Sequence, residues 1–543
     1  MFMTNFLPKV LLPMFLAVSM FLVVSIFPTM AMCGEKATAQ EKTSIQKTKT
    51  SKTNSKQNSS AKADSKKSDK DTNDLSIESS SVTTHTVKIG GVDITYEAEA
   101  ATYVLKKEDG KAQARIFYTA YTKKEKKENL KRPLTFAFNG GPGSSSVWLH
   151  LGAFGPRKIK LDKDGFVPGP PAEITDNPWS ILDVTDLVFI DPVTTGYSRA
   201  VEAKKAKDFH GVEKDIESVG EFVRLYVTRK KRWLSPKFLA GESYGTTRAT
   251  GLVAHMAHKH RMLFNGLILV SSVLDFQTIV FGTGNDLPYI SFLPTYTATG
   301  WYYKKLSPEL MKLTLRQVVE KARNFALNEY SVALLKGSNL PKKERLTIVK
   351  KLAQLTGLKE EYIDDSSLRV SLSAYCKQIL KKEHKIIGRM DSRYTGASFD
   401  LLSERPSYDP SLNYLCGPFS AVFNHYIRAE LGFKSDLPYE LLTGRTWPWN
   451  WGPFKNRYVN MVPRLKRTYA DNPNLKIFIA NGYYDGATPF MATEHTFSHI
   501  FPEDFEKNLT MNYYEAGHMM YTRNKCLKKL KKDLKRWINK SVR

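Results

Sequence analysis

Apolar and polar residues alternate along two early stretches of the chain, residues 85–105 and 114–123. Both stretches are rich in β-branched and aromatic residues, and Gly-Gly and Glu-Asp-Gly-Lys segments supply the turns. Alternation with a period of two is typical of strands that bury one face. We therefore expect an antiparallel meander in which ordered structure begins near His85.

Six short apolar runs follow, and stretches with a helical pattern connect them. A run without polar alternation is typical of a parallel strand that is buried on both faces. Strands connected by helices predict a mostly parallel central sheet with helices on both sides, which is an α/β fold. The runs lie at residues 134–138, 186–191, 237–241, 266–272, 475–481 and 509–516.

Between about residues 276 and 464 the strand-like runs give way to helical patterns. A separate helical domain is one interpretation of this stretch. We favour an inserted helical cap, because strand-like sequence resumes directly after it.

The end of the chain predicts one more helix. Its apolar residues form a single stripe, and its other face is densely basic. A helix packed on the sheet with solvated lysines is the favoured interpretation, and a membrane-surface helix is the alternative. The stripe comprises Leu527, Leu530, Leu534, Trp537 and Ile538.

The N-terminus has Lys9 as its only charge before an uncharged run over residues 10–33. This pattern is typical of a secretory signal, with Ala31 small enough to precede the cleavage site. The run is also long enough to stay as a membrane anchor, so export is expected with or without a tether. Residues 34–83 are Lys-, Ser- and Thr-rich and predict a disordered linker before a folded domain over residues 84–543.

The formal net charge of the 543-residue chain is +27, which suggests an anionic partner. Much of the charge lies in the linker and the last helix, and no nucleic-acid-binding motif is present. We therefore exclude a nucleic-acid function. An oxidising compartment permits a disulfide, for which Cys376 and Cys416 are the candidate pair. The sequence specifies no oligomeric state.

Residues 241–245, Gly-Glu-Ser-Tyr-Gly, form a G-x-S-x-G motif between an apolar run and a helical pattern. In this context the motif predicts a sharp strand-to-helix turn that exposes the hydroxyl of Ser243. The helix that begins at Tyr244 directs N–H groups toward the same point. Ser243 is thus a candidate nucleophile, and the alternative is an ordinary turn that contains a serine.

A serine hydroxyl needs a base and an acid that orients the base. Asp485 follows one apolar run in a glycine-rich loop, and His518 follows the last run. The carboxyl ends of parallel strands share one edge of the sheet, where such folds collect their sites. The sequence therefore predicts a triad of Ser243, His518 and Asp485.

The stretch Asn-Gly-Gly-Pro-Gly at residues 139–143 supplies a flexible loop at the same edge. Acyl transfer needs two N–H donors for the oxyanion, and Gly141 and Tyr244 are our candidates. A phosphate site is excluded, since neither glycine-rich phosphate motif is present. This chemistry requires no cofactor, and the histidines at residues 255, 258 and 260 lack a metal-binding spacing.

The motifs together resemble those of the serine carboxypeptidase family, over about residue 85 to the C-terminus. The resemblance rests on NGGPGSSS, GPR, DPVTTGYS, GESYG, NGYYDGATP and AGHM. It implies an α/β-hydrolase fold with a helical cap and removal of C-terminal residues from peptides, often best at acidic pH. It also implies that Asn139 and Glu242 bind the terminal carboxylate of the substrate.

A glutamate that faces a carboxylate must be protonated. Burial and a nearby like charge would both raise the pKa of Glu242. We expect binding of a free C-terminus to weaken as the pH rises through that pKa.

The chain departs from the family at several points. Ala137 stands where well-known members have tryptophan, and Ala153 replaces the second acid of the carboxylate-binding pair. The Gly-His-Met motif is followed by Met520 and Tyr521 instead of a proline. Arg157 or His150 is a candidate to compensate for the missing acid.

The sequence therefore predicts an exported serine carboxypeptidase whose substrate is a peptide or protein C-terminus. An esterase or acyltransferase on the same site is an alternative. A non-catalytic binding protein tethered to a membrane is another.

Overall fold

The computed structural model describes residues 74–125, 130–500 and 503–542. Within these ranges a sheet of ten strands forms the centre of the molecule. The strands are β1 (Ser80–Ile89), β2 (Val92–Lys106), β3 (Ala112–Lys123), β4 (Leu134–Phe138), β7 (Asp186–Ile190), β8 (Arg199–Ala200), β9 (Lys237–Ser243), β10 (Gly266–Ser272), β13 (Lys476–Gly482) and β14 (Leu509–Tyr514).

The strand order is β1-β2-β3-β7-β4-β9-β10-β13-β14, with β8 paired to β3. All pairings from β7 through β14 are parallel. Each of the six apolar runs forms one of these strands, which confirms the predicted α/β class and mostly parallel sheet.

The meander of β1, β2 and β3 is antiparallel, as its alternating pattern predicts. It begins earlier than expected, because Ser80 already pairs with Ala101, whereas the predicted linker extended to residue 83. The first residues of β1 are exposed or half-buried. These residues are ordered by backbone pairing with β2 and not by burial of apolar side chains. The apolar content of the sequence therefore does not mark where β1 begins. The predicted signal or anchor at residues 1–33 and the rest of the predicted linker, residues 34–73, lie outside the described residues.

The parallel strands β4, β7, β9, β10 and β13 are buried on both faces, which explains why their sequences show no polar alternation, whereas the edge strand β14 is mostly half-buried. Phe238 and Ile268 belong to one core cluster, whereas their neighbours Leu239 and Leu267 belong to another. The second cluster is covered by α1 (Val212–Arg229), α2 (Tyr244–His260) and α11 (Val462–Asp471). The first is covered by α10 (Pro410–Ala429) and α13 (Asn524–Ser541).

Helix α13 packs on the sheet through its predicted apolar stripe. The centroid of the Trp537 ring lies 5.5 Å from the ring centroid of Phe238 and 5.7 Å from that of Phe478. The favoured interpretation of this segment is confirmed. Among the described residues, every helix is too short or too polar to cross a membrane.

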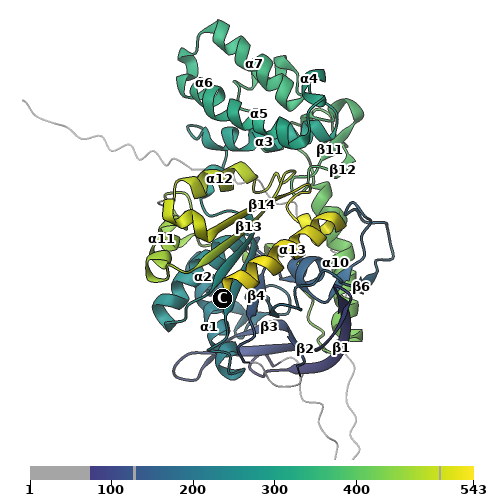
Figure 1. The fold of residues 1–543 in the computed structure, drawn as a ribbon, viewed down its shortest axis with the longest axis vertical. Helices are drawn as coiled ribbons and strands as arrows, with labels where there is room; N and C mark the ends of the chain where they lie inside the picture. The colour runs from purple at the N-terminus through teal and green to yellow at the C-terminus, as the bar shows by residue number, and fades with distance from the viewer. Residues whose placement is uncertain (1–73, 126–129, 501–502, 543) are drawn as a thin grey trace, which may run out of the picture.

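A third core cluster lies in a group of helices beyond one end of the sheet (Figure 1). We call residues 287–378 the cap. Its helices are α3 (Leu287–Tyr302), α4 (Pro308–Met311), α5 (Leu315–Phe325), α6 (Ser331–Lys336), α7 (Lys342–Thr356), α8 (Glu360–Asp365) and α9 (Leu372–Gln378). Helices α10 and α11, also within the helical stretch at 276–464, instead pack on the two faces of the sheet.

Shorter elements complete the described chain. They include β5 (Arg157–Ile159), β6 (Ile174–Asp176), β11 (Lys385–Ile387), β12 (Thr395–Ala397), α12 (Phe490–Ser498), a π-helix at Leu149–Phe154 and a 3-10 turn at Met520–Thr522. The π-helix and the 3-10 turn both bear on the candidate site.

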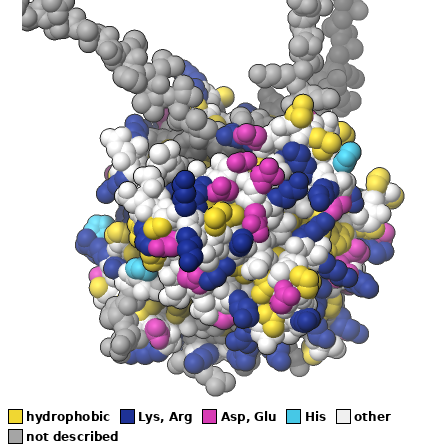
Figure 2. Space-filling model, turned by 90° about the horizontal axis from the view of Figure 1, so that it is seen from above, with side chains coloured by type: hydrophobic (Ala, Val, Ile, Leu, Met, Phe, Trp, Pro, Cys, Tyr) yellow, Lys and Arg dark blue, Asp and Glu magenta, His cyan; other side chains and the backbone are white. Residues whose placement is uncertain are grey.

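Figure 2 views the molecule from the cap end, where Lys and Arg side chains are interspersed with Asp and Glu. Ion pairs of the cap account for part of this mixture. Lys336 Nζ lies 2.6 Å from Glu344 Oε2, and Arg345 Nε lies 2.6 Å from Asp364 Oδ1. The basic balance of the chain is therefore not gathered in one block on this face.

The candidate disulfide is not formed. Cys376 is a free, buried thiol in α9 and belongs to the cap cluster, whereas Cys416 in α10 packs against a cluster beneath the sheet. Within the described chain, no bond therefore joins this pair, because the two helices bury their cysteines in different cores.

Candidate active site

Ser243 ends β9 and directly precedes α2, with φ +60° and ψ −131°. Few residues other than glycine adopt this conformation, which indicates a strained turn. A Cβ atom at Gly241 would lie 2.1 Å from the carbonyl oxygen of Gly245, and one at Gly245 would lie 2.9 Å from that of Phe138. A side chain at either flanking position would clash with the backbone, so both positions require glycine. The turn is as sharp as the motif predicts.

The glycine-rich loop after β4 lies directly against this turn. A Cβ atom at Gly140 would lie 2.5 Å from the backbone nitrogen of Tyr244. Gly141 has φ +98°, a conformation that favours glycine. The two candidate oxyanion donors, Gly141 and Tyr244, therefore come from backbone segments that are in contact.

A buried ion pair between Arg248 and Asp215 contacts the same glycine-rich loop. Arg248 on α2 donates from Nε to Asp215 Oδ2 at 2.7 Å and from Nη1 to the carbonyl oxygen of Asn139 at 2.5 Å. Both charged side chains are almost fully buried. This ion pair was not predicted, because an arginine in one helix and an aspartate in another carry no local sequence signal of their contact.

Asp485 and His518 are fully buried and in contact, with 2.9 Å between Asp485 Oδ2 and His518 Nδ1. The backbone N–H groups of Ala487 and Thr488 donate to Asp485 Oδ1 at 2.8 and 2.9 Å. The Thr488 hydroxyl donates to Asp485 Oδ2 at 2.8 Å. Thr488 was not predicted, although the D-x-x-T spacing is a signal for a carboxylate that accepts from its own turn.

The other ring nitrogen of His518, Nε2, is buried and has no hydrogen-bond partner among the described residues. The carbonyl oxygen of His518 accepts from Ser271 Oγ at 2.7 Å, and the next residue, Ser272, pairs with Ser243 in the sheet. Burial alone lowers the pKa of His518, but the charge and hydrogen bond of Asp485 outweigh it and raise the pKa above its usual value.

Glu242 is buried beside this pair. Burial raises its pKa to about 7, and the negative charge of Asp485 acts in the same direction. The charge of His518 and hydrogen bonds with Tyr521 and Asn139 act against the shift. A carboxyl with this pKa is protonated in mildly acidic solution, as binding of a second carboxylate requires.

The two candidates to replace the missing second acid bind other residues, so their contacts give that hypothesis no support. Arg157 binds Asp176, with Nη1 and Oδ1 2.5 Å apart, and Glu430, with Nη2 and Oε1 2.9 Å apart. His150 Nε2 lies 2.6 Å from Tyr121 Oη, and burial lowers the pKa of His150 to about 3.

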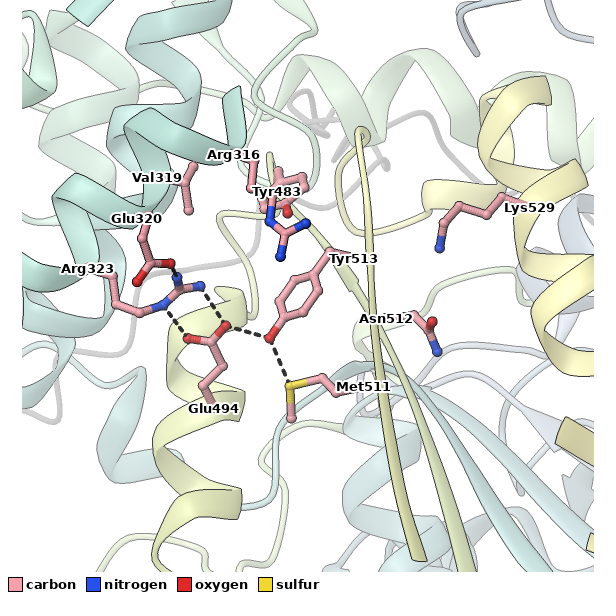
Figure 3. Close-up of a pocket in the computed structure, with 10 residues that line it drawn as sticks. All are labelled: Arg316, Val319, Glu320, Arg323, Tyr483, Glu494, Met511, Asn512, Tyr513 and Lys529. Atoms are coloured by element: carbon pink, nitrogen blue, oxygen red, sulfur yellow. Dashed lines mark hydrogen bonds and ion pairs between the residues drawn. The ribbon is translucent and has the colours of Figure 1, made fainter. Parts of the chain in front are cut away.

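A cavity of about 560 Å³ lies between the cap and the edge strand β14 (Figure 3). Its charged groups largely satisfy each other: Arg323 of α5 binds Glu494 of α12 through two hydrogen bonds of 2.8 and 3.0 Å, and Tyr513 Oη donates to Glu494 Oε1 at 2.6 Å. None of the predicted site residues lines it. We interpret the cluster as a link between the cap and the sheet.

Comparison with known proteins agrees with the hydrolase-like geometry of this site. The family model for serine carboxypeptidase matches residues 90–386. Serine carboxypeptidase-like 19 of Arabidopsis thaliana is 29% identical over 150 residues, which cover 26% of this chain and 30% of that protein. The pheromone-processing carboxypeptidase KEX1 of Saccharomyces cerevisiae is 30% identical over 144 residues, which cover 25% of this chain and 18% of that protein. The matched region thus spans less than a third of either relative.

The fold has a solved counterpart. The structure of the prohormone-processing carboxypeptidase KEX1 from Saccharomyces cerevisiae superposes with a TM-score of 0.53 at 16% identity. The match covers 82% of this chain and 91% of that one. At this identity it shows a shared fold, which confirms the predicted α/β-hydrolase architecture.

Proposed function

Since the chain belongs to the serine carboxypeptidase family, we propose that it hydrolyses C-terminal peptide bonds through an acyl-enzyme on Ser243. The observation that carries this proposal is the buried Asp485–His518 hydrogen bond, with His518 Nε2 left without a partner among the described residues. The backbone of His518 accepts a hydrogen bond from Ser271, whose neighbour Ser272 pairs with Ser243. Such an arrangement is what a serine needs to become a nucleophile.

In the first half of the proposed reaction, Ser243 Oγ attacks the carbonyl carbon of the last peptide bond and gives its proton to His518 Nε2. Asp485 holds His518 with its proton on Nδ1 and stabilises the imidazolium. The N–H groups of Gly141 and Tyr244 stabilise the oxyanion. His518 then donates the proton to the leaving amine, which departs as the C-terminal amino acid.

In the second half, His518 takes a proton from water, and the resulting hydroxide attacks the acyl-enzyme. The tetrahedral intermediate again places its oxyanion between the two N–H donors. Its collapse releases the shortened peptide and returns the proton to Ser243 Oγ. No group beyond these residues and water is required.

The terminal carboxylate of the substrate is proposed to bind Glu242 and Asn139. Glu242 can donate a hydrogen bond only while it is protonated, and its pKa of about 7 permits this in mildly acidic solution. The Asn139 amide is held in place, since its Oδ1 accepts from the backbone N–H of Leu149 at 3.1 Å. This leaves the amide N–H groups for other partners.

The catalytic domain is proposed to extend over the folded residues from β1 onward, with the cap shaping the pocket for side chains near the scissile bond. Action outside the cytoplasm is proposed as well, on the strength of the uncharged run at residues 10–33. Cleavage of that run would release the enzyme, and its retention would tether the enzyme to the membrane.

The test is hydrolysis of N-blocked dipeptides that carry either a free or an amidated C-terminus. We expect release of the C-terminal amino acid from the free acids in mildly acidic solution, little from the amides, and none by a Ser243→Ala variant. Turnover of simple esters without turnover of free-acid peptides would favour the esterase or acyltransferase alternative. Turnover of amides but not of free acids would contradict the proposal.

A further inference from the structure

The carboxylate-binding pair expected from the family is incomplete, because Ala153 stands where the second acid belongs. From the contacts around Glu242 we infer that Tyr521 takes over the task of that acid, as a positioning residue that fixes the carboxyl of Glu242 for the free C-terminus of the substrate. This inference rests on the proposed function and adds to it a specificity-determining residue.

The first observation is a short hydrogen bond in a closed environment. Tyr521 Oη donates to Glu242 Oε2 at 2.7 Å. The tyrosine is fully buried and the glutamate is only 3% exposed, so water does not compete for either group. Asn139, which is also buried, lies close enough to lower the pKa values of both Glu242 and Tyr521, so the three side chains are neighbours.

The second observation is that the chain makes room for the tyrosine ring next to Ala153. A Cβ atom at Gly152 would lie 2.5 Å from Tyr521 Cε2 and 3.4 Å from Phe419 Cζ. Any side chain at residue 152 would therefore collide with the ring. The absence of a side chain at Gly152, the residue before Ala153, therefore leaves the space that the ring of Tyr521 occupies.

The chemistry follows from which groups can donate. Burial raises the pKa of Tyr521 far above its usual value, so the hydroxyl keeps its proton in the working pH range. Because Tyr521 donates to Oε2, a protonated Glu242 carries its own proton on Oε1. That proton is then directed away from the tyrosine and is available to a carboxylate.

The groups that face Glu242 are Asp485 and His518 from the loops after β13 and β14, Tyr521 from the 3-10 turn, and Asn139 from the loop after β4. Asp485 favours the protonated form, whereas Tyr521 favours the ionised form. Loss of the tyrosine hydroxyl should therefore keep Glu242 protonated to a higher pH. It should also release the orientation of the carboxyl.

The experiment compares the parent enzyme with Tyr521→Phe on an N-blocked dipeptide and on the ethyl ester of the same N-blocked amino acid. At about pH 5.5 we expect KM for the dipeptide to rise about tenfold with kcat within about twofold. The alkaline limb of kcat/KM should move up by about one pH unit. Ester kinetics should stay within about twofold, since the ester has no terminal carboxylate.

Tyr514→Phe is the matched control, because Tyr514 is equally buried and donates to the carboxylate of Asp533 at 3.0 Å, on α13. Its KM and alkaline limb should equal those of the parent. Should Tyr521→Phe fail to fold, Gly152→Ala displaces the ring with its hydroxyl intact and should raise KM for the dipeptide alone.

The inference would be overturned if Tyr521→Phe left both KM for the dipeptide and the alkaline limb of kcat/KM unchanged. It would also be overturned if the variant lost kcat/KM equally on the dipeptide and the ester. Either result would leave the proposed function standing. A parent enzyme that hydrolyses the ester and not the dipeptide would instead overturn the proposed function, and this inference with it.

Discussion

At the scale of single residues, the protonation of Glu242 decides when a free C-terminus can bind. Burial and Asp485 raise its pKa to about 7, against the effects of His518, Tyr521 and Asn139. Below that pH the carboxyl is neutral and can donate to the substrate. Above it two carboxylates would face each other, so kcat/KM for free-acid peptides should fall as the pH rises through about 7.

We predict that Glu242→Gln removes this alkaline limb. The glutamine amide is neutral at every pH and can still accept from Tyr521 and donate to the substrate. The measurement is kcat/KM of parent and variant on one free-acid dipeptide between about pH 5 and about pH 9. The variant should stay within about tenfold of the parent in acidic solution and exceed it in alkaline solution. A variant that keeps the parental limb would assign the limb to another group.

The residues of the candidate site differ in how far the sequence predicts them. Ser243 ends a strand, Asp485 and His518 follow strands, and all three carry motif signals. The structure brings Asp485 and His518 into contact. Tyr521 and Arg248 carry no such signal. Their roles depend on contacts with Glu242 and Asn139, which only the folded chain brings near.

At the scale of elements, the cap is joined to the sheet by a partly buried ion pair between α5 and α12. Arg323 reaches Glu494 with two nitrogens, and Glu494 also accepts from Tyr513. We predict that Arg323→Met loosens this link and speeds amide hydrogen exchange in α5 and α12 by roughly 5- to 30-fold. Arg316→Met is the control, since Arg316 lines the same cavity from the same helix. Equal exchange in the two variants would show that the pair does not hold the cap.

Helix α13 offers a second test at this scale. Leu534 is fully buried against the sheet, whereas Lys532 on the opposite face is exposed. Leu534→Ala should lower the free energy of unfolding by about 2–5 kcal/mol, and Lys532→Ala should change it by no more than about 0.5 kcal/mol. Urea titration monitored by tryptophan fluorescence measures both. A Leu534→Ala variant as stable as the parent would mean that the stripe does not pack on the sheet in solution.

The elements themselves follow closely from the sequence, for reasons that differ between them. The parallel strands are short apolar runs, and their ends lie within two residues of the ends of the runs, because all of them except the edge strand β14 are buried on both faces. The start of β1 is not marked in this way, because its exposed Ser and Thr residues are ordered by pairing with β2. Helical periodicity predicts the helices between β10 and β13, yet it does not say that α10 and α11 return to the sheet.

At the scale of the whole molecule, residues separated by hundreds of positions meet at the carboxyl edge of one sheet. In the sheet, β4 lies beside β9, and β10 alone separates β9 from β13. Asn139 and Asp485 lie in the loops after β4 and β13, and Ser243 is the last residue of β9. The topology of the sheet therefore explains why motifs that are distant in the chain describe a single site.

The most direct test of the account is the reaction of the whole protein with a fluorophosphonate, followed by peptide mapping of the adduct. We predict one covalent adduct, on Ser243, which is absent in Ser243→Ala and forms far more slowly in His518→Ala. An intact, folded protein that forms no adduct, or forms it on a residue other than Ser243, would contradict the account.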